Sequence, residues 1–387
     1  MILNTNIIFC CAFILQSLLY VSANIHFNIY KGGPKSVSQG KPKPPNPWKN
    51  DTIVLTKFMD FEYYGTIRIG QPAKEFKMTF DTSWADSWVP SARCGILEIS
   101  CQLHTRYDSS KSSTYQEQGS PFEITNANFS LKGFTSMDNF HLPHVAVLNQ
   151  TFVEMTHMSW RPFSFYKADG IIGLGFIAQS QISGSIPFLY NMVKQKVIPS
   201  PLFTIYMNRD ETTSKAGRLI LGSTERKHVK GDLTTIRIID KTRWAIKIDT
   251  FIVNSTAKNH VFCTNTCNAT IDSSSHSIIG PASDIRRIND LIGAKEFSFQ
   301  GYTVYTVDCR TYAKLPHLEF QINEVWFEIS SKYYIEHYNY HSIDLCLSPF
   351  VPGGNTLEWS LGGAFLMEFY TEYDINGGVI RIGKTLF

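Results

Sequence analysis

The sequence shows little charge imbalance and no long apolar run beyond its N-terminus. Its 36 basic and 33 acidic side chains leave a formal charge of +3 over 387 residues, which argues neither for a nucleic-acid partner nor for an anionic membrane. After residue 23, no apolar segment approaches the ~20 residues that a membrane-spanning helix needs. A phosphate-binding glycine loop and the Gly-x-Ser-x-Gly motif of serine hydrolases are absent. The remaining composition, 43% hydrophobic and rich in Phe and Tyr, is typical of a folded globular chain.

Metal and cofactor motifs are also scarce. The pairs His337/His341 and His141/His144 have spacings that metal ligands use, but neither comes with a third ligand or the glutamate of a zinc protease. Zinc is an alternative use of Cys263 and Cys267, although their spacing is not Cys-x-x-Cys and no second pair accompanies them. We therefore expect no metal and no cofactor.

The N-terminus has the pattern of an export signal. Residues 1–23 contain the apolar segment "IIFCCAFILQSLLYVSA" and end in small residues at Ala23, although the usual positive n-region is missing. A Pro/Lys-rich arm, residues 24–57, follows. The pattern predicts a secreted protein, and delivery to a lysosome-like acidic compartment is the alternative.

Six cysteines remain after removal of this signal, and an even number in an exported chain indicates three disulfides. Sequence order does not fix the pairing, and sequential pairing is the simplest choice. The cysteines are Cys94, Cys101, Cys263, Cys267, Cys309 and Cys346. Four sequons are expected glycosylation sites: Asn50, Asn128, Asn149 and Asn254. A fifth, Asn268, is expected to lie in a buried strand and to stay unmodified.

The chain contains an internal repeat. "MTFDTSWADSW" precedes "ADGIIGLG", and "ATIDSSSHSIIG" precedes "EWSLGGAF". Asp81 lies 92 residues before Gly173, and Asp272 lies 90 residues before Gly362. Turn signals and β-branched or aromatic runs dominate, and only "PFLYNMVKQKVI" and "ASDIRRINDLIGA" are clear helix candidates. A duplicated, mainly β chain predicts two lobes, each presenting one Asp turn to a central cleft.

Two facing aspartates are suited to peptide hydrolysis. Carboxylates held close together share one proton, so the ionised member can activate water while its partner protonates the substrate carbonyl. The chemistry needs neither a metal nor a covalent intermediate.

With these motifs the chain resembles the pepsin-like aspartic proteases, the family of pepsin and cathepsin D. "FMDFEYYGTIRIGQPAKEF", "SSKSSTY", "ADGIIGLGF", "FCTNTCNATID", "IIGPAS" and "FYTEYDINGGVIRIG" match the family framework in order. The resemblance implies a bilobal pepsin-like acid protease fold with two pseudo-twofold-related lobes, residues 58–233 and 234–387. It also implies the disulfides Cys94–Cys101, Cys263–Cys267 and Cys309–Cys346. A monomer that takes a peptide or protein in its cleft is expected.

The family's two Asp-Thr-Gly loops are altered here. Asp81 and Asp272 are retained, and so are the following hydroxyl residues that the family uses to link the loops. Serine replaces both glycines, where a side chain is expected to crowd the shared water or displace the turn. Trp84 replaces a small hydroxyl residue. The loop residues are Thr82, Ser83 and Trp84 in the first lobe and Ser273, Ser274 and Ser275 in the second.

The flap, expected near residues 124–131, differs as well. Alignment with the family's Tyr-Gly-x-Gly places Asn126, Ala127, Asn128 and Phe129 there. The flap tyrosine, which contacts the conserved position of Trp88, is thus replaced by Asn126. The family's Leu-Gly-Asp also becomes Leu361-Gly362-Gly363. These changes predict a catalytically inactive or weakly active homologue that still binds peptide. The alternative is an acid endopeptidase in which Asp81 and Asp272 activate water.

Overall fold

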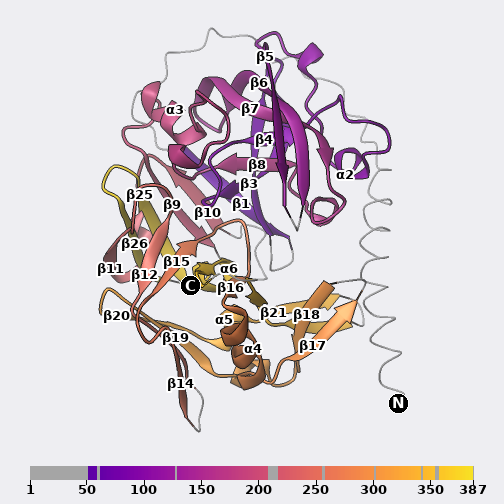
Figure 1. The fold of residues 1–387 in the computed structure, drawn as a ribbon. Coiled ribbons are helices and arrows are strands. Elements are labelled where there is room, and N and C mark those ends of the chain that lie inside the picture. The colour runs from indigo at the N-terminus through magenta and orange to yellow at the C-terminus, as the bar shows by residue number, and fades with distance from the viewer. Residues whose placement is uncertain are drawn as a thin grey trace.

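The computed structural model describes residues 51–58, 62–126, 129–207, 217–254, 258–299, 302–340, 343–353 and 357–386. These residues form a mainly β structure of two lobes, drawn one above the other in Figure 1. The expected fold class is therefore confirmed. Among the described residues, no helix is long and apolar enough to cross a membrane.

The N-terminal half carries the strands β1 (Asp51–Phe58), β2 (Glu62–Ile69), β3 (Lys74–Asp81), β4 (Trp88–Pro90), β5 (Gln116–Thr125), β6 (Ser130–His141), β7 (Ala146–Met158), β8 (Gly170–Gly173), β9 (Leu202–Met207), β10 (Gly217–Leu221) and β11 (Val229–Arg237). Together with β25 (Phe369–Asp374) and β26 (Val379–Thr385), they form one 13-stranded sheet, in the order β11-β26-β25-β9-β10-β1-β2-β3-β8-β4-β7-β6-β5. The strand β1 occupies an inner place in it, so residues 51–57 of the expected arm are part of the sheet.

The C-terminal half carries β12 (Ala245–Ile248), β13 (Thr250–Asn254), β14 (Asn259–Phe262), β15 (Cys267–Ile271), β16 (Ile278–Gly280), β17 (Lys295–Phe299), β18 (Tyr302–Val307), β19 (His317–Ile322), β20 (Val325–Ile329), β21 (Glu336–Tyr340), β22 (Ile343–Leu347), β23 (Phe350–Pro352), β24 (Trp359–Leu361), β25 (Phe369–Asp374) and β26 (Val379–Thr385). Three smaller sheets hold β12 to β24. The last two strands leave this lobe, because β25 pairs with β9 and β26 with β11. The expected lobe boundary, residues 233/234, lies inside β11.

The helices are short: α2 (Ile99–Gln102), α3 (Phe188–Lys194), α4 (Ala282–Leu291), α5 (Ser331–Tyr334) and α6 (Gly363–Leu366), with 3₁₀ turns η1 (Ser109–Lys111), η2 (Phe163–Phe165), η3 (Ile177–Gln179), η4 (Arg226–His228) and η5 (Tyr312–Lys314). Both predicted helices are present, as α3 and α4. In α4, Ile285 and Ile288 are buried while Arg286 and Arg287 are exposed, the pattern of an amphipathic helix packed on the lobe core.

Strand β3 shows how the sequence directs the first Asp loop to the interior. Phe76, Met78 and Phe80 are buried, whereas Lys77 between them is exposed. This alternation buries one face of the strand in the N-terminal core. The strand becomes buried on both faces as it reaches Asp81, so the loop that follows begins deep between the lobes.

Candidate active site

The two Asp loops end equivalent strands. Asp81 is the last residue of β3 and lies opposite Gly173 in the parallel pairing with β8. Asp272 follows β15, which pairs in parallel with β24 and its neighbouring Gly362. Both glycines are required by close approach, because a Cβ at Gly173 would collide with the main chain of Ala85, and one at Gly362 with that of Ser275. The repeat read from the sequence thus corresponds to two matching structural units.

Hydroxyl groups link the loops across the lobe boundary. The main-chain N–H of Thr82 donates to Ser273 Oγ at 3.1 Å, and the N–H of Ser273 donates to Thr82 Oγ1 at 3.0 Å. Each hydroxyl then donates to a carbonyl of the opposite lobe, at Ile271 (2.8 Å) and Phe80 (2.6 Å). All four groups are buried, so this reciprocal set fixes one loop against the other.

Ser83 and Ser274, which were expected to disturb the Asp loops, both form hydrogen bonds to the aspartates. Ser83 N–H donates to Asp81 Oδ1 at 2.7 Å, and Ser274 N–H donates to Asp272 Oδ1 at 2.9 Å. With serine in place of glycine, both backbone N–H groups therefore point to the carboxylate of their own loop. Each serine hydroxyl adds a second donor to the same carboxylate oxygen, at 2.7 Å for Ser83 and 2.8 Å for Ser274. The Ser274 hydroxyl also interacts with Asp81.

The two carboxyl groups are electrostatically coupled. Burial, followed by the charge of Asp272, raises the pKa of Asp81 to about 7, against the opposing hydrogen bonds from Ser83 and Ser274. Asp81 is 3% exposed, and Asp272 is partly exposed toward the cleft. A buried carboxyl beside a like charge keeps its proton, so the site holds one proton between two acids over the acidic range.

Hydrogen bonds from neighbouring elements stabilise each Asp loop. Gln179 Nε2 donates to the Ser83 carbonyl at 3.1 Å, and Gly175 N–H donates to the Trp84 carbonyl at 2.8 Å. In the second lobe, the first N–H groups of α6 donate to carbonyls of residues 275 and 276. Both Asp loops are therefore held by hydrogen bonds to their main-chain carbonyls, which do not depend on the altered side chains.

Gly363, which stands where the family has an aspartate, faces His276. A Cβ at Gly363 would come within 3.0 Å of His276 Nδ1. The imidazole is buried, and its Nε2 lies 3.5 Å from Glu336 Oε1 on β21. The space next to Gly363 is thus occupied by a buried histidine that lies close to a carboxylate on another strand.

A cavity of about 260 Å³ opens beside the Asp pair. Its walls are mostly apolar and aromatic, and the polar groups at its edge include both aspartates, Ser83 and Ser274. Its lining also includes Glu62, Trp84, Trp88, Phe129, Phe163 and Tyr166. An apolar cavity next to a few convergent polar groups is the usual form of a small-ligand or peptide subsite.

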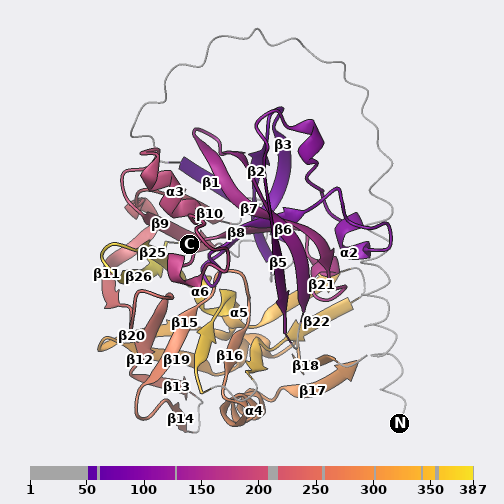
Figure 2. The same ribbon diagram turned by 45° about the horizontal axis from the view of Figure 1, so that its top comes forward.

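The hairpin β5–β6 reaches from the N-terminal lobe toward the other lobe in Figures 1 and 2. Asn126 is exposed and closes its tip, because its N–H donates to the Phe129 carbonyl and its Oδ1 accepts from the Phe129 N–H, both at 3.0 Å. Phe129 points back to the cavity, with its ring centroid 6.4 Å from Trp84 and 5.6 Å from Phe163. Ala127 and Asn128 lie outside the described residues.

Trp88 is buried at the cavity wall, where its ring meets the Phe163 ring edge-on at 5.6 Å. Its Nε1 is buried and has no hydrogen-bond acceptor among the described residues. A buried indole N–H normally finds a partner. The absence agrees with the interpretation that the hydroxyl of a flap tyrosine is missing here.

Two residues of the cavity were not singled out by sequence reasoning. Glu62 is buried and accepts hydrogen bonds from the N–H groups of Lys167 (2.7 Å) and Ala168 (2.8 Å), and burial raises its pKa to about 7. Tyr166 reaches the same cavity. Only their positions in the sequence could have identified them. Glu62 begins the "EYYGTI" strand, and Tyr166 lies four residues before the glycine that begins "GIIGLG".

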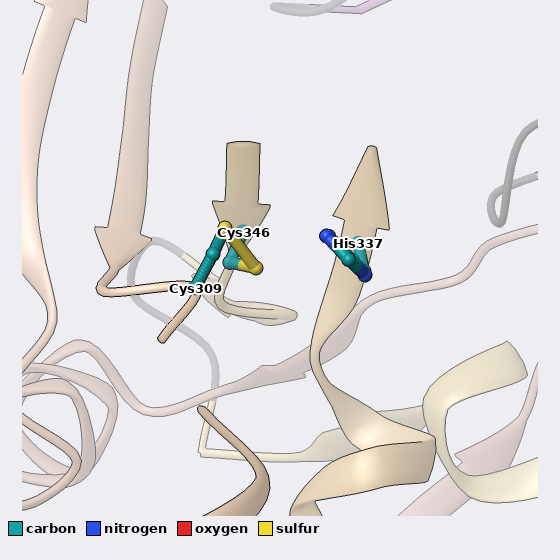
Figure 3. Close-up of side chains that lie close together, drawn as sticks. All are labelled: Cys309, His337 and Cys346. Carbon is teal, nitrogen blue, oxygen red and sulfur yellow. A yellow bond between two sulfur atoms is a disulfide. The ribbon is translucent and has the colours of Figure 1, made fainter. Parts of the chain in front are cut away.

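The three disulfides are present as expected: Cys94–Cys101, Cys263–Cys267 and Cys309–Cys346. Cys263 and Cys267 are therefore not free thiolate ligands for zinc. His337 lies beside the third disulfide (Figure 3), with its ring nitrogen and both sulfurs within 4.8 Å of one another. Because both sulfurs are bonded to each other, this group offers one ordinary metal ligand.

The sequons differ in their surroundings. Asn149 and Asn254 are exposed, whereas Asn50 and Asn128 lie outside the described residues. Asn268 is in β15 as expected, but its side chain is exposed on the outer face of the strand, so the expectation that it is buried was wrong. The period-2 alternation of β15 explains this, because Ala269 and Ile271 take the inner positions.

The chain is similar to known proteins over most of its length. The family described as "Eukaryotic aspartyl protease" matches residues 62–385. Cathepsin D of Gallus gallus is 33% identical over 336 residues, covering 86% of this chain and 82% of its own. Renin of Canis lupus familiaris is 34% identical over 338 residues, covering 86% and 81%. Cathepsin D of Dictyostelium discoideum is 31% identical over 379 residues, covering 95% and 94%.

Proposed function

Because this chain belongs to the eukaryotic aspartyl protease family, whose members act on peptides, we propose that it binds extended peptides in its cleft and hydrolyses them only weakly. One observation carries this proposal. The hydroxyls of Ser83 and Ser274 each donate to a carboxylate oxygen of the Asp pair, and Ser274 interacts with both aspartates. A water held between the carboxylates must compete with hydroxyls that are already bound there.

The flap adds a second defect. The aligned Asn126 closes its own hairpin, and the Trp88 indole N–H lacks an acceptor among the described residues. Loss of one preorganised donor near a reacting centre costs on the order of 100–1000-fold in rate. The two changes together predict a kcat/KM at least about 100-fold below the usual enzyme range of ~10⁴–10⁸ M⁻¹s⁻¹.

The binding function needs only the cleft, which is retained. The crossed hydroxyls of Thr82 and Ser273 hold the lobes in register, and the cavity beside Asp81 is lined by aromatic side chains. Bulky apolar side chains of a peptide suit such walls. Burial of one of them contributes about 1.5–3 kcal/mol to the free energy of binding.

A fully active acid endopeptidase is the second candidate, and the Asp pair favours it. The backbone N–H donors of both loops are aimed as catalysis requires, and the raised pKa of Asp81 matches a shared proton. Thr82, Ser273 and both aspartates keep the roles expected from the resemblance in either case.

An acid proteolysis assay separates the two functions. Purified mature protein is incubated with denatured globin at acidic pH, with and without a statine-type transition-state mimic, and Asp272→Asn serves as the inactive control. We expect slow or no cleavage together with measurable binding of the mimic. Cleavage at an ordinary rate that Asp272→Asn abolishes would establish the active alternative.

We further propose that the protein is an exported, glycosylated monomer. The N-terminal apolar segment and the three disulfides support export, because disulfides persist in oxidising compartments. Extracellular delivery and an acidic lumen both fit these features. Analytical ultracentrifugation and N-terminal sequencing of protein from the culture medium test these points.

A further inference from the structure

The loop that the Cys94–Cys101 disulfide closes carries large apolar side chains into solvent. Ile96 and Leu97, in the middle of this loop, are 87% and 89% exposed. Ile99 on α2 and Leu103, which follows α2 directly, are 54% and 42% exposed. A single exposed apolar residue is ordinary, but a group of four neighbours forms a patch of the kind that marks an interaction site. We refer to residues 94–103 as the apolar loop.

The base of the apolar loop is fixed to the N-terminal lobe. Cys101 is fully buried, and Ser100 Oγ donates to the Ser159 carbonyl at 3.0 Å. Within the loop, Gln102 Nε2 donates to the Gly95 carbonyl at 3.0 Å. In Figures 1 and 2, α2 lies at the margin of this lobe. The apolar side chains are therefore held outward before a partner binds, which reduces the conformational entropy lost on binding.

Three basic side chains flank the apolar loop. Arg93 directly precedes the loop and is exposed, and its Nη2 lies 3.5 Å from Ser109 Oγ. Arg106 follows the loop, and Lys74 of β3 reaches the same segment, because its Nζ donates to the Arg106 carbonyl at 2.7 Å. In the part of the chain that the structure describes, none of the three forms an ion pair with a carboxylate.

The carboxylates near the loop are engaged by other groups. Glu98 lies 2.9 Å from His157 Nδ1, and Asp108 pairs with Lys111 at 2.9 Å. Glu75 lies opposite an arginine of β2 in the β2–β3 pairing. The chain as a whole is close to neutral, at +3 over 387 residues. The local excess of positive charge beside the apolar loop is therefore not visible in the overall composition.

A lipid bilayer fits this surface better than a protein partner does. Stable protein interfaces bury about 800 Å² on each side and centre on Trp, Tyr and Arg side chains in matching pockets. The apolar loop instead projects aliphatic side chains outward, and a fluid acyl layer accepts such projections without a preformed pocket. Trp160, next to Ser159 and thus beside α2, is exposed, and tryptophan prefers the level of the lipid headgroups. The flanking basic side chains complement anionic headgroups.

We propose that the apolar loop docks the protein on a bilayer that contains anionic phospholipids. Ile96 and Leu97 enter the boundary between headgroups and acyl chains, and the basic side chains around the loop contact the headgroups. The protein binds at the surface of the bilayer and does not span it. None of these residues belongs to the Asp loops or to the β5–β6 hairpin, so the inference does not rest on the proposed function.

Co-sedimentation of the mature protein with vesicles of phosphatidylcholine and phosphatidylserine tests this surface. Ile96→Ser/Leu97→Ser should lower the partition coefficient about 100-fold, because two apolar side chains no longer leave water. Its thermal unfolding midpoint should equal that of the parent, since both side chains are already exposed in the folded protein. Val261→Ser/Leu357→Ser is the matched control: it removes two exposed aliphatic side chains from the C-terminal half and should leave the partition coefficient unchanged.

A second variant tests the basic side chains. Lys74→Gln/Arg106→Gln should weaken binding to the mixed vesicles about 30-fold and leave binding to pure phosphatidylcholine vesicles unchanged, because neutral headgroups do not attract cations. Failure of the parent to sediment with the mixed vesicles, or equal binding by the parent and either double variant, would overturn the proposal. Sedimentation velocity without lipid should show a monomer. A dimer that Ile96→Ser/Leu97→Ser dissociates would assign the apolar loop to a second copy of this chain and would also overturn the proposal.

Discussion

Restoring glycine to the two Asp loops should raise turnover and shift its pH profile. Ser83 Oγ lies 2.7 Å from Asp81 Oδ1, and Ser274 Oγ lies 2.8 Å from Asp272 Oδ1. Hydrogen bonds to charged groups contribute about 1.5–3 kcal/mol. We take the low value, about 1.5 kcal/mol, because a backbone N–H already donates to the same oxygen.

The sign of the pH shift follows from which protonation state the hydroxyls stabilise. They donate to the ionised carboxylates, so their removal favours the protonated form and raises the pKa of Asp81 further. At 1.36 kcal/mol per pH unit, the shift is about one unit upward. The space released between the carboxylates also admits the nucleophilic water, and we expect a gain of about 10–100-fold in kcat/KM.

The assay compares the parent with the double variant Ser83→Gly/Ser274→Gly, using a fluorogenic peptide between pH 2 and 7. The Ser83→Ala/Ser274→Ala variant removes the hydroxyls but keeps each Cβ, and should show the pH shift with a smaller gain in rate. Ser275→Ala should change neither, because the Ser275 hydroxyl accepts from Ser277 N–H and does not contact the Asp pair. A glycine variant that folds and binds the statine-type mimic, yet gains neither rate nor pH shift, would refute the reasoning.

Further repair should be cumulative: adding Trp84→Ser and Asn126→Tyr to the glycine variant is expected to raise kcat/KM again, and no gain in a folded quadruple variant would place the defect in other subsites. Glycopeptide mass spectrometry of the exported protein should find sugar on Asn128 and on the exposed Asn254, and an unmodified Asn128 would remove the glycan as an obstacle to flap closure. Because the pKa of Glu62 is raised to about 7 by burial, the folded state binds its proton more tightly than the unfolded state, and stability should fall as pH rises from about 4.5 to 7. Glu62→Gln should reduce this fall by about 3 kcal/mol in urea titrations, and an unchanged pH dependence would contradict the assignment.

Much of the fold could be predicted from the sequence because a duplicated chain repeats the same motifs in both halves. The spacing of Asp81 to Gly173 and of Asp272 to Gly362 predicted two matching units, and main-chain geometry requires both glycines. The disulfide pairs came from the family resemblance. The side chain of Asn268 was expected to be buried because the residue follows a cysteine in what looks like a buried strand, whereas the alternation within β15 turns it outward.

The effect of serine at positions 83 and 274 could not be predicted from residue types alone. A hydroxyl either displaces a turn or joins its hydrogen bonds, and the outcome depends on distances of a few tenths of an ångström. The turning of Phe129 into the cavity depended on the hairpin tip. The position of Tyr166 depends on Glu62, which lies more than a hundred residues earlier in the chain and accepts a hydrogen bond from the N–H of the next residue, Lys167.

The positions of β25 and β26 in the large sheet have a consequence for folding during synthesis. β26 lies between β11 and β25, and β25 pairs with β9, so the large sheet needs strands that are made more than a hundred residues after β9 and β11. Until residues 369–385 have been synthesised, β9 and β11 lack these partners and present open edges able to pair with other chains. This sheet therefore cannot form completely before Thr385 has been made, and a product truncated before Val379 should be retained by cellular quality control even though both Asp loops are present.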